Sequence, residues 1–484
     1  MRYPSRRIAL LCCALVGCLF TRVCADDDLS FEQFLIQADD LQPPTDGSVR
    51  RLPLTDPAPV DPPPLQPPPV ADSQTVPAEA AADPPESPPP PIQNLDAAMP
   101  DNMISSQLRT QEFDSPATTS MNNDFTKFPD FVGGILIEGE RAAMKIGGYV
   151  KADFISDFDP IDSTDSFDTT TIPIGAPPRR NARFHARQSR LSFDTRWKTG
   201  GEVMRAFIEA DFFGDGSDGS NAFRLRHAYG TYGRFTAGQT WTTFTDPSAV
   251  PNTLDFEGAV SNVNRRQGLV RWTQPILWDG LSLAAALENP RINFEIPSGV
   301  QGVGRTESPD VIARLRYEQD WGEFQSAMVL RELGFQPVDQ DVITGTAWGF
   351  NFTGSVMPTD TIKGYYQITF GEGIGSYRGS PDVIATGPDT ASILPMFGWM
   401  VGCKREWSDR WSSNLTYSRL DLEAIPGQAP DNLRSTTYLA VNLINTPYER
   451  VFWGIEYLYG IRENQSGARA DANRVQMSFG FLLP

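Results

Sequence analysis

Residues 348–371 read WGFNFTGSVMPTDTIKGYYQITFG, which is two alternating segments on either side of a short turn. Trp348, Phe350 and Phe352 share one parity, while Gly349 and Asn351 share the other. Alternation with a period of two predicts β-strands that have one apolar and one polar face. The stretch therefore predicts an antiparallel hairpin, which a soluble sandwich or a membrane barrel could equally contain.

Similar segments follow one another from residue 143 to the end of the chain. The predicted strands are 143–155, 184–197, 202–213, 222–232, 234–241, 264–273, 281–288, 309–318, 322–332, 345–357, 360–371, 395–407, 410–421, 434–444, 449–460 and 470–483. A closed antiparallel barrel whose two ends lie on one side of a membrane needs an even number of strands. The sequence thus predicts an all-β fold, a 16-stranded antiparallel transmembrane β-barrel.

The connections between these strands alternate between short and long, and this alternation distinguishes a barrel from a sandwich. Short turns fall at Lys198–Gly200, Gly233, Glu318–Trp321, Met357–Thr359, Ser408–Asp409 and Asn445–Pro447. Long connections fall at 156–183, 242–263, 289–308, 333–344, 372–394, 422–433 and 461–469. Outer-membrane barrels have short periplasmic turns and long exterior loops.

Aromatic side chains gather near the short turns, as they do at membrane interfaces. They are Trp197, Tyr232, Trp272, Tyr317, Trp321, Trp407 and Trp411. The alternative is that they are ordinary core aromatics, but their shared position at one rim favours an interfacial girdle. The sequence therefore predicts a location in the cell outer membrane, with the lipid as a partner.

Composition excludes several other classes of protein. The 484 residues carry a formal net charge of −19, which argues against a nucleic-acid partner. The mean hydropathy is −0.32, and no stretch after residue 25 approaches the roughly 20 apolar residues of a spanning helix. A helical membrane protein is therefore excluded, whereas a barrel with a polar lumen is not.

The N-terminal part is expected to divide into two segments ahead of the barrel. Residues 1–25 form a predicted signal peptide with cleavage after Ala25, although the lipobox-like residues before Cys18 leave a lipoprotein signal open. Residues 26–130 are Pro-rich and are predicted to be a largely disordered periplasmic tail, which could contact a cell-envelope polymer. Residues 131–484 are the predicted barrel domain.

The sequence offers little for catalysis or metal binding. Removal of the signal peptide leaves Cys403 as the one cysteine, and the only histidines are His185 and His227. A disulfide framework, a cysteine metal site and a zinc enzyme are therefore not expected. We expect no enzyme activity, no metal and no cofactor.

Arginines are the main candidate functional residues of the predicted barrel. Parity places eight of them inside the lumen: Arg190, Arg205, Arg224, Arg226, Arg265, Arg271, Arg314 and Arg316. An arginine facing lipid at mid-depth would cost about 2–4 kcal/mol. Each could instead be a structural partner of Glu209, Asp211 or Asp194, but their clustering favours a wall that selects anions.

The connection 242–263 is a candidate constriction loop. It carries Asp246, Asp255, Phe256 and Glu257. A loop folded into the lumen at this place would narrow the pore, and its carboxylates would face the arginines. The alternative is a plain extracellular loop.

Several stretches together resemble the DcaP-like trimeric outer-membrane porins. They are Gly147–Asp153 (GGYVKAD), Phe184–Phe193 (FHARQSRLSF), Ile208–Phe213 (IEADFF), Phe223–Gly230 (FRLRHAYG), Ala237–Trp241 (AGQTW) and Thr253–Phe256 (TLDF). The resemblance is dense over 145–275 and thinner to the end. It implies a homotrimeric sixteen-stranded porin with an inward third loop, which takes up small, often negatively charged solutes such as dicarboxylates. A selectivity wall would then fall at Arg190, Arg205, Arg224, Arg226 and Arg271.

Two functions of an outer-membrane barrel remain open at this point, and a secreted soluble β-protein, which would purify without detergent, is a third alternative. The first is a porin for passive diffusion and ion transport, with anion selectivity set by the arginines. The second is a structural outer-membrane barrel that anchors the envelope through its tail and transports little. Conductance with anion preference would distinguish the first from the second.

Overall fold

The computed structural model describes residues 135–483, apart from 139–141, 200–201, 216–220 and 298. The predicted signal peptide and the predicted Pro-rich tail lie outside the described residues. Three 3-10 helices lie in the long connections of the described residues: η1 (Thr169–Thr171), η2 (Pro247–Ala249) and η3 (Gly375–Tyr377). No helix in the described ranges is long and apolar enough to cross a bilayer.

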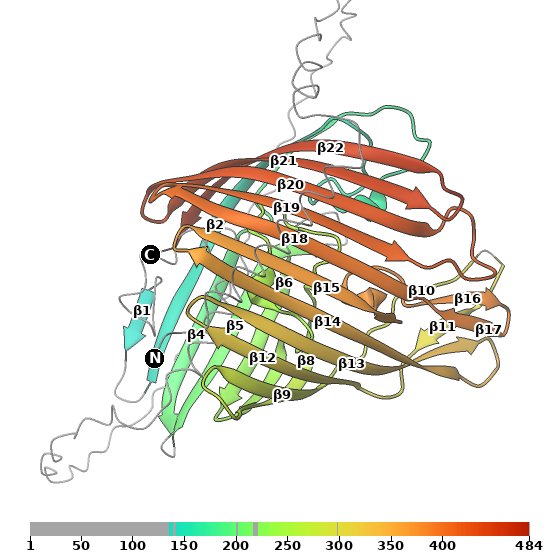
Figure 1. The fold of residues 1–484 in the computed structure, drawn as a ribbon, viewed down its shortest axis with the longest axis horizontal. Coiled ribbons are helices and arrows are strands. Elements are labelled where there is room, and N and C mark those ends of the chain that lie inside the picture. The colour runs from blue at the N-terminus through green and yellow to red at the C-terminus, as the bar shows by residue number, and fades with distance from the viewer. Residues whose placement is uncertain (1–134, 139–141, 200–201, 216–220, 298, 484) are drawn as a thin grey trace, which may run out of the picture. The chain divides into compact units, whose positions relative to one another are not determined.

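Sixteen strand positions form one closed antiparallel barrel (Figure 1). The wall strands are β2 (Ala142–Asp157), β4 (Arg190–Thr199), β5 (Glu202–Asp215), β6 (Asn221–Tyr232), β7 (Phe235–Trp241), β8 (Arg266–Pro275), β9 (Leu281–Glu288), β12 (Asp310–Gln319), β13 (Gly322–Pro337), β14 (Ile343–Thr359), β15 (Ile362–Glu372), β18 (Pro395–Ser408), β19 (Trp411–Leu422), β20 (Leu433–Tyr448), β21 (Val451–Asn464) and β22 (Arg469–Leu482). Pairing of β2 with β22, from Tyr149↔Leu482 to Asp157↔Arg474, closes the cylinder. The predicted fold class is confirmed.

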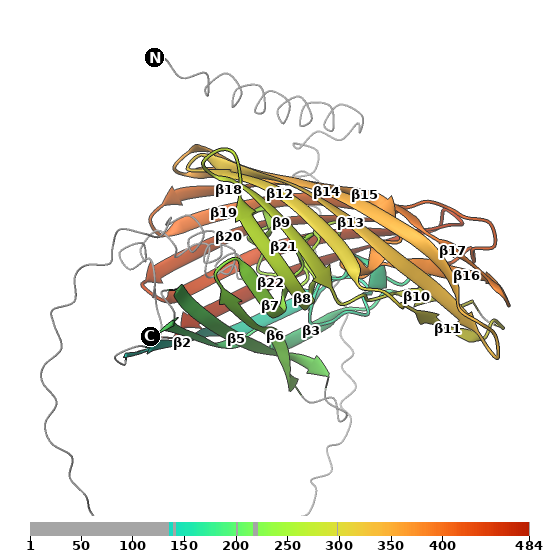
Figure 2. The ribbon, with the colours of Figure 1, turned by 90° about the horizontal axis from the view of Figure 1, so that it is seen from below.

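Short additional strands extend this wall at the ends of the barrel strands. β1 (Ile135–Glu138) and β3 (Asn181–His185) both pair with β2, and β11 (Gly302–Arg305) pairs with β13. A separate small sheet contains β10 (Phe294–Glu295), β16 (Val383–Gly387) and β17 (Thr390–Ile393). Figure 2 shows β10, β11, β16 and β17 together at one end of the barrel, the end to which the long connections belong.

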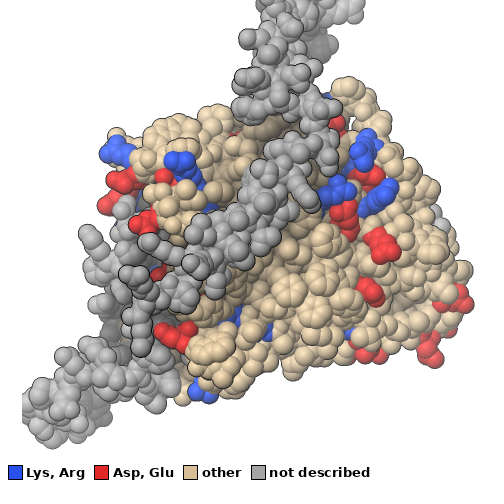
Figure 3. All heavy atoms as spheres, in the orientation of Figure 1, with Lys and Arg blue, Asp and Glu red and all other residues tan. Residues whose placement is uncertain are grey.

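The wall strands bury their polar parity and expose their apolar parity, which is the inverse of a soluble protein. On β12, Val311 and Leu315 are 48% and 42% exposed, whereas Arg314 and Arg316 are buried. Exposed apolar side chains suit contact with lipid, and the polar parity then faces a lumen. Figure 3 shows charged side chains gathered towards the edges of one face, with a broad uncharged band between them.

The strand boundaries differ most clearly from the predicted ones at two places. The predicted long connection 333–344 is mostly strand, because β13 and β14 continue to the pair Phe335↔Ile343 and leave only residues 338–342 as a turn. The predicted strand 184–197 is divided between β3 and β4. Ser189 lies at the break, where its Oγ accepts a hydrogen bond from the Lys151 backbone N–H at 3.0 Å in place of a ladder carbonyl.

Candidate functional site

The connection between β7 and β8, residues 242–265, lies inside the barrel. Phe244, Asp246 and Leu254 are fully buried there. Glu456 on the inner face of β21 accepts hydrogen bonds from the Leu254 and Asp255 backbone N–H groups, at 2.9 and 2.8 Å. The loop is thus held against the strand wall by its main chain.

Further contacts fix the loop along the same inner surface. The Asn351 side chain on β14 donates to the Phe244 carbonyl at 2.8 Å, and the Ser261 N–H donates to Ser418 Oγ on β19 at 2.9 Å. Lys151 Nζ on β2 donates to the Leu254 carbonyl at 2.7 Å. Contacts from β2, β14, β19 and β21 to one loop require that it crosses the lumen, so this connection is not a plain extracellular loop.

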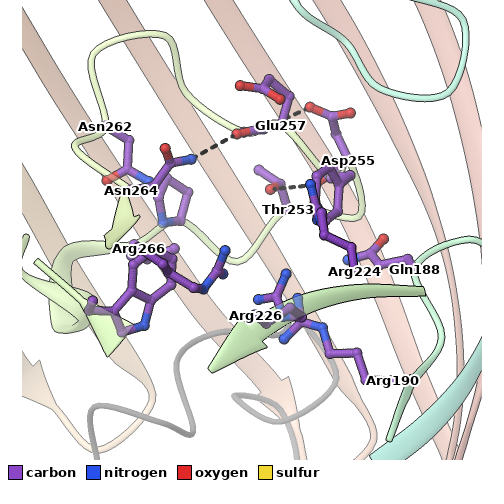
Figure 4. Close-up of a pocket in the computed structure, with 15 residues that line it drawn as sticks. Gln188, Arg190, Arg224, Arg226, Thr253, Asp255, Glu257, Asn262, Asn264 and Arg266 are labelled. Carbon is purple, nitrogen blue, oxygen red and sulfur yellow. Dashed lines mark hydrogen bonds between the residues drawn. The ribbon is translucent and has the colours of Figure 1, made fainter. Parts of the chain in front are cut away.

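A cavity of about 220 Å³ separates this loop from the strands that carry most of the predicted arginines. Arg190, Arg224 and Arg226 line one side, and the loop residues Asp255, Glu257 and Asn262 line another (Figure 4). The remaining lining residues are Gln188, Trp241, Val250, Pro251, Thr253, Phe256, Gly258, Asn264 and Arg266.

The arginines of this cavity are held by two carboxylates of β5. Asp211 binds Arg224 at 2.6 Å and Arg226 at 3.0 Å. Glu209 binds Arg226 at 2.6 Å and lies 3.7 Å from Arg190. Three guanidinium groups therefore share two carboxylates, so the wall keeps an excess positive charge.

A bulge in the β5–β6 ladder directs these side chains inward. The register shifts between Glu209 and Ala210, so that consecutive residues Arg226 and His227 are both buried. A bulge leaves an extra residue unpaired and changes which parity faces inward. On the next strand, Gly238 has a φ of +123°, and a Cβ there would lie 2.3 Å from the Ala228 carbonyl oxygen, so only glycine fits.

Two further predicted arginines have carboxylate partners on neighbouring strands. Arg205 donates two hydrogen bonds to Asp194, at 2.9 and 3.0 Å, and a third to the Tyr229 hydroxyl at 3.3 Å. Arg316 pairs with Glu323 across the β12–β13 hairpin. The predicted partnership with Asp194, Glu209 or Asp211 therefore exists for Arg190, Arg205, Arg224 and Arg226.

The other three predicted arginines differ. Within the part of the chain that the structure describes, the side chains of Arg265, Arg271 and Arg314 have no ion pair and no hydrogen-bond partner, and the Nε of each is buried. Arg271 and Arg314 lie on the inward parity of β8 and β12, and Arg265 directly precedes β8. The eight arginines thus divide into five that are paired and three that are not.

The predicted constriction-loop residues also divide. Phe256 stacks on Phe213 with a ring separation of 3.8 Å, and the Arg224 guanidinium lies 5.1 Å from the Phe256 ring. Glu257 pairs with Arg378 at 2.5 Å. Asp246 does not line the cavity, because it accepts from Thr353 Oγ at 2.5 Å on β14 and from the Ser248 N–H at 3.0 Å.

Asp255 is buried at the cavity edge within the loop. Burial raises the pKa of its carboxyl group, against the opposing effects of the Arg474 charge and of N–H donors from Gly258 and Phe167. Its two oxygens accept from those N–H groups at 2.9 and 2.8 Å. The Asp255 carboxylate therefore mainly organises the loop.

Sequence reasoning did not identify several residues of the site. Lys151, Arg378 and Glu456 fix the loop, and Trp241 and Arg266 line the cavity with the Arg266 guanidinium 3.8 Å from a Trp241 ring. Glu456 could have been found, because it is the one carboxylate in the apolar run Val451–Ile461. Arg378 could not, since it comes from a long connection that has no periodic pattern.

Comparison with solved structures finds matches among outer-membrane proteins. The outer membrane channel DcaP of Acinetobacter baumannii matches with a TM-score of 0.65 and 20% identity, over 73% of this chain and 100% of that one. Outer-membrane expressed OmpT of Vibrio cholerae and OmpF of Salmonella typhi each match with a TM-score of 0.47 and 11% identity, over 72% of this chain and 100% of theirs.

A comparison with curated proteins finds no match. The family model described as DcaP outer membrane protein matches residues 134–481, which is most of the chain and the barrel wall up to the next-to-last residue of β22. The match confirms the family resemblance and the predicted outer-membrane location of the barrel. The chain belongs to the DcaP outer membrane protein family.

Proposed function

We propose that the barrel admits small hydrophilic solutes by passive diffusion and prefers anions, among them dicarboxylates. The observation that carries this proposal is the excess of guanidinium groups on the lumen wall. At the cavity Arg190, Arg224 and Arg226 share Glu209 and Asp211, and Arg265, Arg271 and Arg314 have no carboxylate partner among the described residues. Rings of arginine favour anions in a pore.

Loop 242–265 serves in this proposal as the constriction. Because the loop lies across the lumen, the remaining path passes beside the arginines. Phe256 and Pro251 add an apolar surface to this cavity. A narrow, low-dielectric passage strengthens the interaction of a passing charge with fixed charges. Small solutes with one or two carboxylates fit this combination.

Reversal-potential measurements in planar lipid bilayers test the anion preference. R224S and R226S should shift the reversal potential towards cations, because each removes one positive charge from a cluster in which three guanidinium groups share two carboxylates. R305S is the matched control, since Arg305 is exposed on β11 and its removal should change selectivity little. An unchanged selectivity in R224S and R226S would show that neither residue determines the anion preference.

A silent but folded barrel would favour the alternative of a structural envelope protein. The same recordings distinguish the two functions, because a plugged barrel carries no current at any potential. Detergent-solubilised protein whose heat-modifiable migration is intact would show that the silence is not caused by misfolding.

We also propose a homotrimer, with the short turns and a segment of about 26–130 in the periplasm. This proposal is supported by the length of two wall strands, β7 and β9, which have 7 and 8 residues. A strand needs about 9–11 residues to span the lipid, so the barrel wall is too short there. Strands that are too short to span the lipid are suited to contact with other copies of the chain. Native mass spectrometry of the detergent-solubilised protein should give the mass of three chains, and a monomer mass would contradict this arrangement.

A further inference from the structure

Arg271 on β8 and Arg314 on β12 differ from the cavity arginines because no carboxylate of the described protein lies within ion-pair distance of them. Neither has an ion pair or a side-chain hydrogen bond among the described residues, and the Nε of each is buried without a partner. A buried Nε–H without an acceptor is costly, because it has lost the water that would accept its hydrogen bond. A persistent arrangement of this kind points to an external anion.

The strand between them makes room for the two groups to share one ligand. Arg271 pairs in register with Ala286 of β9, and Arg314 pairs with Ala284. Both alanines are buried on the inward parity of β9, whereas Ala285 and Leu287 between and beside them are exposed. Two methyl groups leave the inner surface of β9 open to guanidinium groups that reach over it from both sides.

The carboxylates within electrostatic reach are already bound elsewhere. Glu288, the acidic group that acts on Arg271, accepts from the Thr243 N–H and from Gln267 Nε2, both at 2.7 Å. Asp246 and Glu323 act on Arg314 from a distance. Asp246 is held by Thr353, and Glu323 is held by Arg316. The N–H groups of Arg271 and Arg314 therefore remain available to a solute.

We infer that Arg271 and Arg314 form a second anion site, distinct from the cavity at Phe256. It would take one oxyanion group of a small solute, a carboxylate or a phosphate, because a guanidinium presents its donors in a planar fork that matches both. This inference rests on the proposed function, and it adds a second binding site along the path of the solute through the lumen.

The position of the pair gives this second site an order relative to the first. β8 and β12 both run towards short turns. Arg271 lies in the half of β8 nearer to its turn, and Arg314 lies at the middle of β12. Arg224 lies near the opposite, long-loop end of β6. A solute that leaves the cavity towards the short-turn rim would meet Arg271 and Arg314 next.

Crystals of the full chain soaked with selenate test the site directly. We expect an anomalous difference peak within hydrogen-bond distance of both guanidinium groups in the native protein, and no peak there in R271Q/R314Q. Native crystals without a peak at the pair, from a channel that still prefers anions, would overturn the second site and leave the proposed function standing. A cation-preferring native channel would instead contradict the proposed function.

Single-channel block by inorganic phosphate provides a second measurement. In R271Q/R314Q the phosphate concentration for half-block should rise about tenfold or more, because each charged hydrogen bond contributes about 1.5–3 kcal/mol and 1.4 kcal/mol is a factor of ten. Neither substitution leaves a buried carboxylate unpaired, so folding should be preserved. R305Q is the control, with the half-block concentration expected to match the native value. A value in R271Q/R314Q equal to that of R305Q would contradict the site.

Discussion

The arginines on β4–β6 and those on β8 and β12 occupy the same inner surface but have different surroundings. On β4–β6 the predicted lumen arginines lie against carboxylates of a neighbouring strand, as in the pairs Arg205–Asp194 and Arg224–Asp211. On β8 and β12 the facing positions of β9 are alanines. Arginine thus has two roles in the lumen. Paired arginines stabilise the wall, and unpaired arginines attract anionic solutes.

The difference shows that selectivity cannot be read from a count of lumen arginines. Asp211 and Glu209 cancel most of the charge of Arg190, Arg224 and Arg226, so these residues shape the cavity while adding one net positive charge. Arg271 and Arg314 have no such cancellation at hydrogen-bond distance in the described structure. Substitutions that separate the two groups should therefore affect stability and selectivity differently.

The largest expected effect is on stability, from removal of a carboxylate on the paired side. D211N should lower the free energy of unfolding by about 3 kcal/mol, because it leaves the buried Arg226 with one charge partner fewer and unbalances Arg224. Urea unfolding of the barrel in lipid vesicles measures this. D421N is the matched control, since Arg419 and Asp421 are 39% and 38% exposed and such pairs contribute less than about 1 kcal/mol. Equal losses in the two variants would contradict the structural role of the paired wall.

The next effect concerns the loop that brings the cavity against the paired arginines. E456Q should increase open-channel noise and mean conductance, because the amide can accept from only one of the two N–H groups of Leu254 and Asp255. The cost is about 1–3 kcal/mol for a buried donor left without an acceptor. Single-channel recording gives the noise and the conductance. A quiet channel of native conductance would show that Glu456 does not hold the loop in place.

A smaller effect on stability is expected when acid protonates Asp165, which lies in a loop outside the wall strands. Burial raises the pKa of Asp165, but the Arg187 hydrogen bond and the positive charges of His185, Arg183 and Arg187 outweigh it and hold the pKa below the ordinary 3.8. Asp165 therefore stabilises its loop above pH 3.8, and this contribution is lost as the pH falls through its lowered pKa. Hydrogen exchange of residues 158–180 should rise in that range in the native protein. D165N should exchange faster already at neutral pH, and a native-like profile in D165N would exclude the ion pairs as the cause.

The smallest effect on stability is expected on the unpaired side. R314Q should change the free energy of unfolding by less than about 1 kcal/mol, or raise it slightly, because it removes a buried charge that has no carboxylate partner in the described structure. The same urea unfolding in vesicles applies, with R205Q as the comparison. R205Q leaves Asp194 without its two Arg205 hydrogen bonds and should be clearly less stable. A loss in R314Q as large as that in R205Q would mean that Arg314 has a structural partner.

The sequence predicted the barrel well because its two physical requirements repeat along the chain. Every wall strand must alternate between lipid and lumen, and this alternation gave all sixteen strands to within a few residues at most ends. The error at 333–344 arose where β13 and β14 extend past their predicted ends, so that a pairing such as Phe335↔Ile343 was not anticipated. Backbone hydrogen bonds between β13 and β14 continue the ladder there, and the alternation of apolar and polar residues does not reveal such bonds.

The site was predictable only in part. Parity placed the arginines inside, and the place of 242–263 after the fifth strand indicated an inward loop, but which arginine would face a carboxylate depends on strand register. The bulge at Glu209 and Ala210 and the alanines opposite Arg271 and Arg314 decide that pairing, and neither has a sequence signal of its own. Long-range contacts such as Glu456 with the loop lie about 200 residues apart in the chain and depend on barrel closure.

The reversal potential of the native channel across a potassium chloride gradient tests the central claim most directly. Uncancelled guanidinium groups in the lumen predict that chloride carries more of the current than potassium, with a reversal potential displaced towards the chloride equilibrium value. A displacement towards the potassium equilibrium value would contradict the claim that the arginines set the selectivity of this channel.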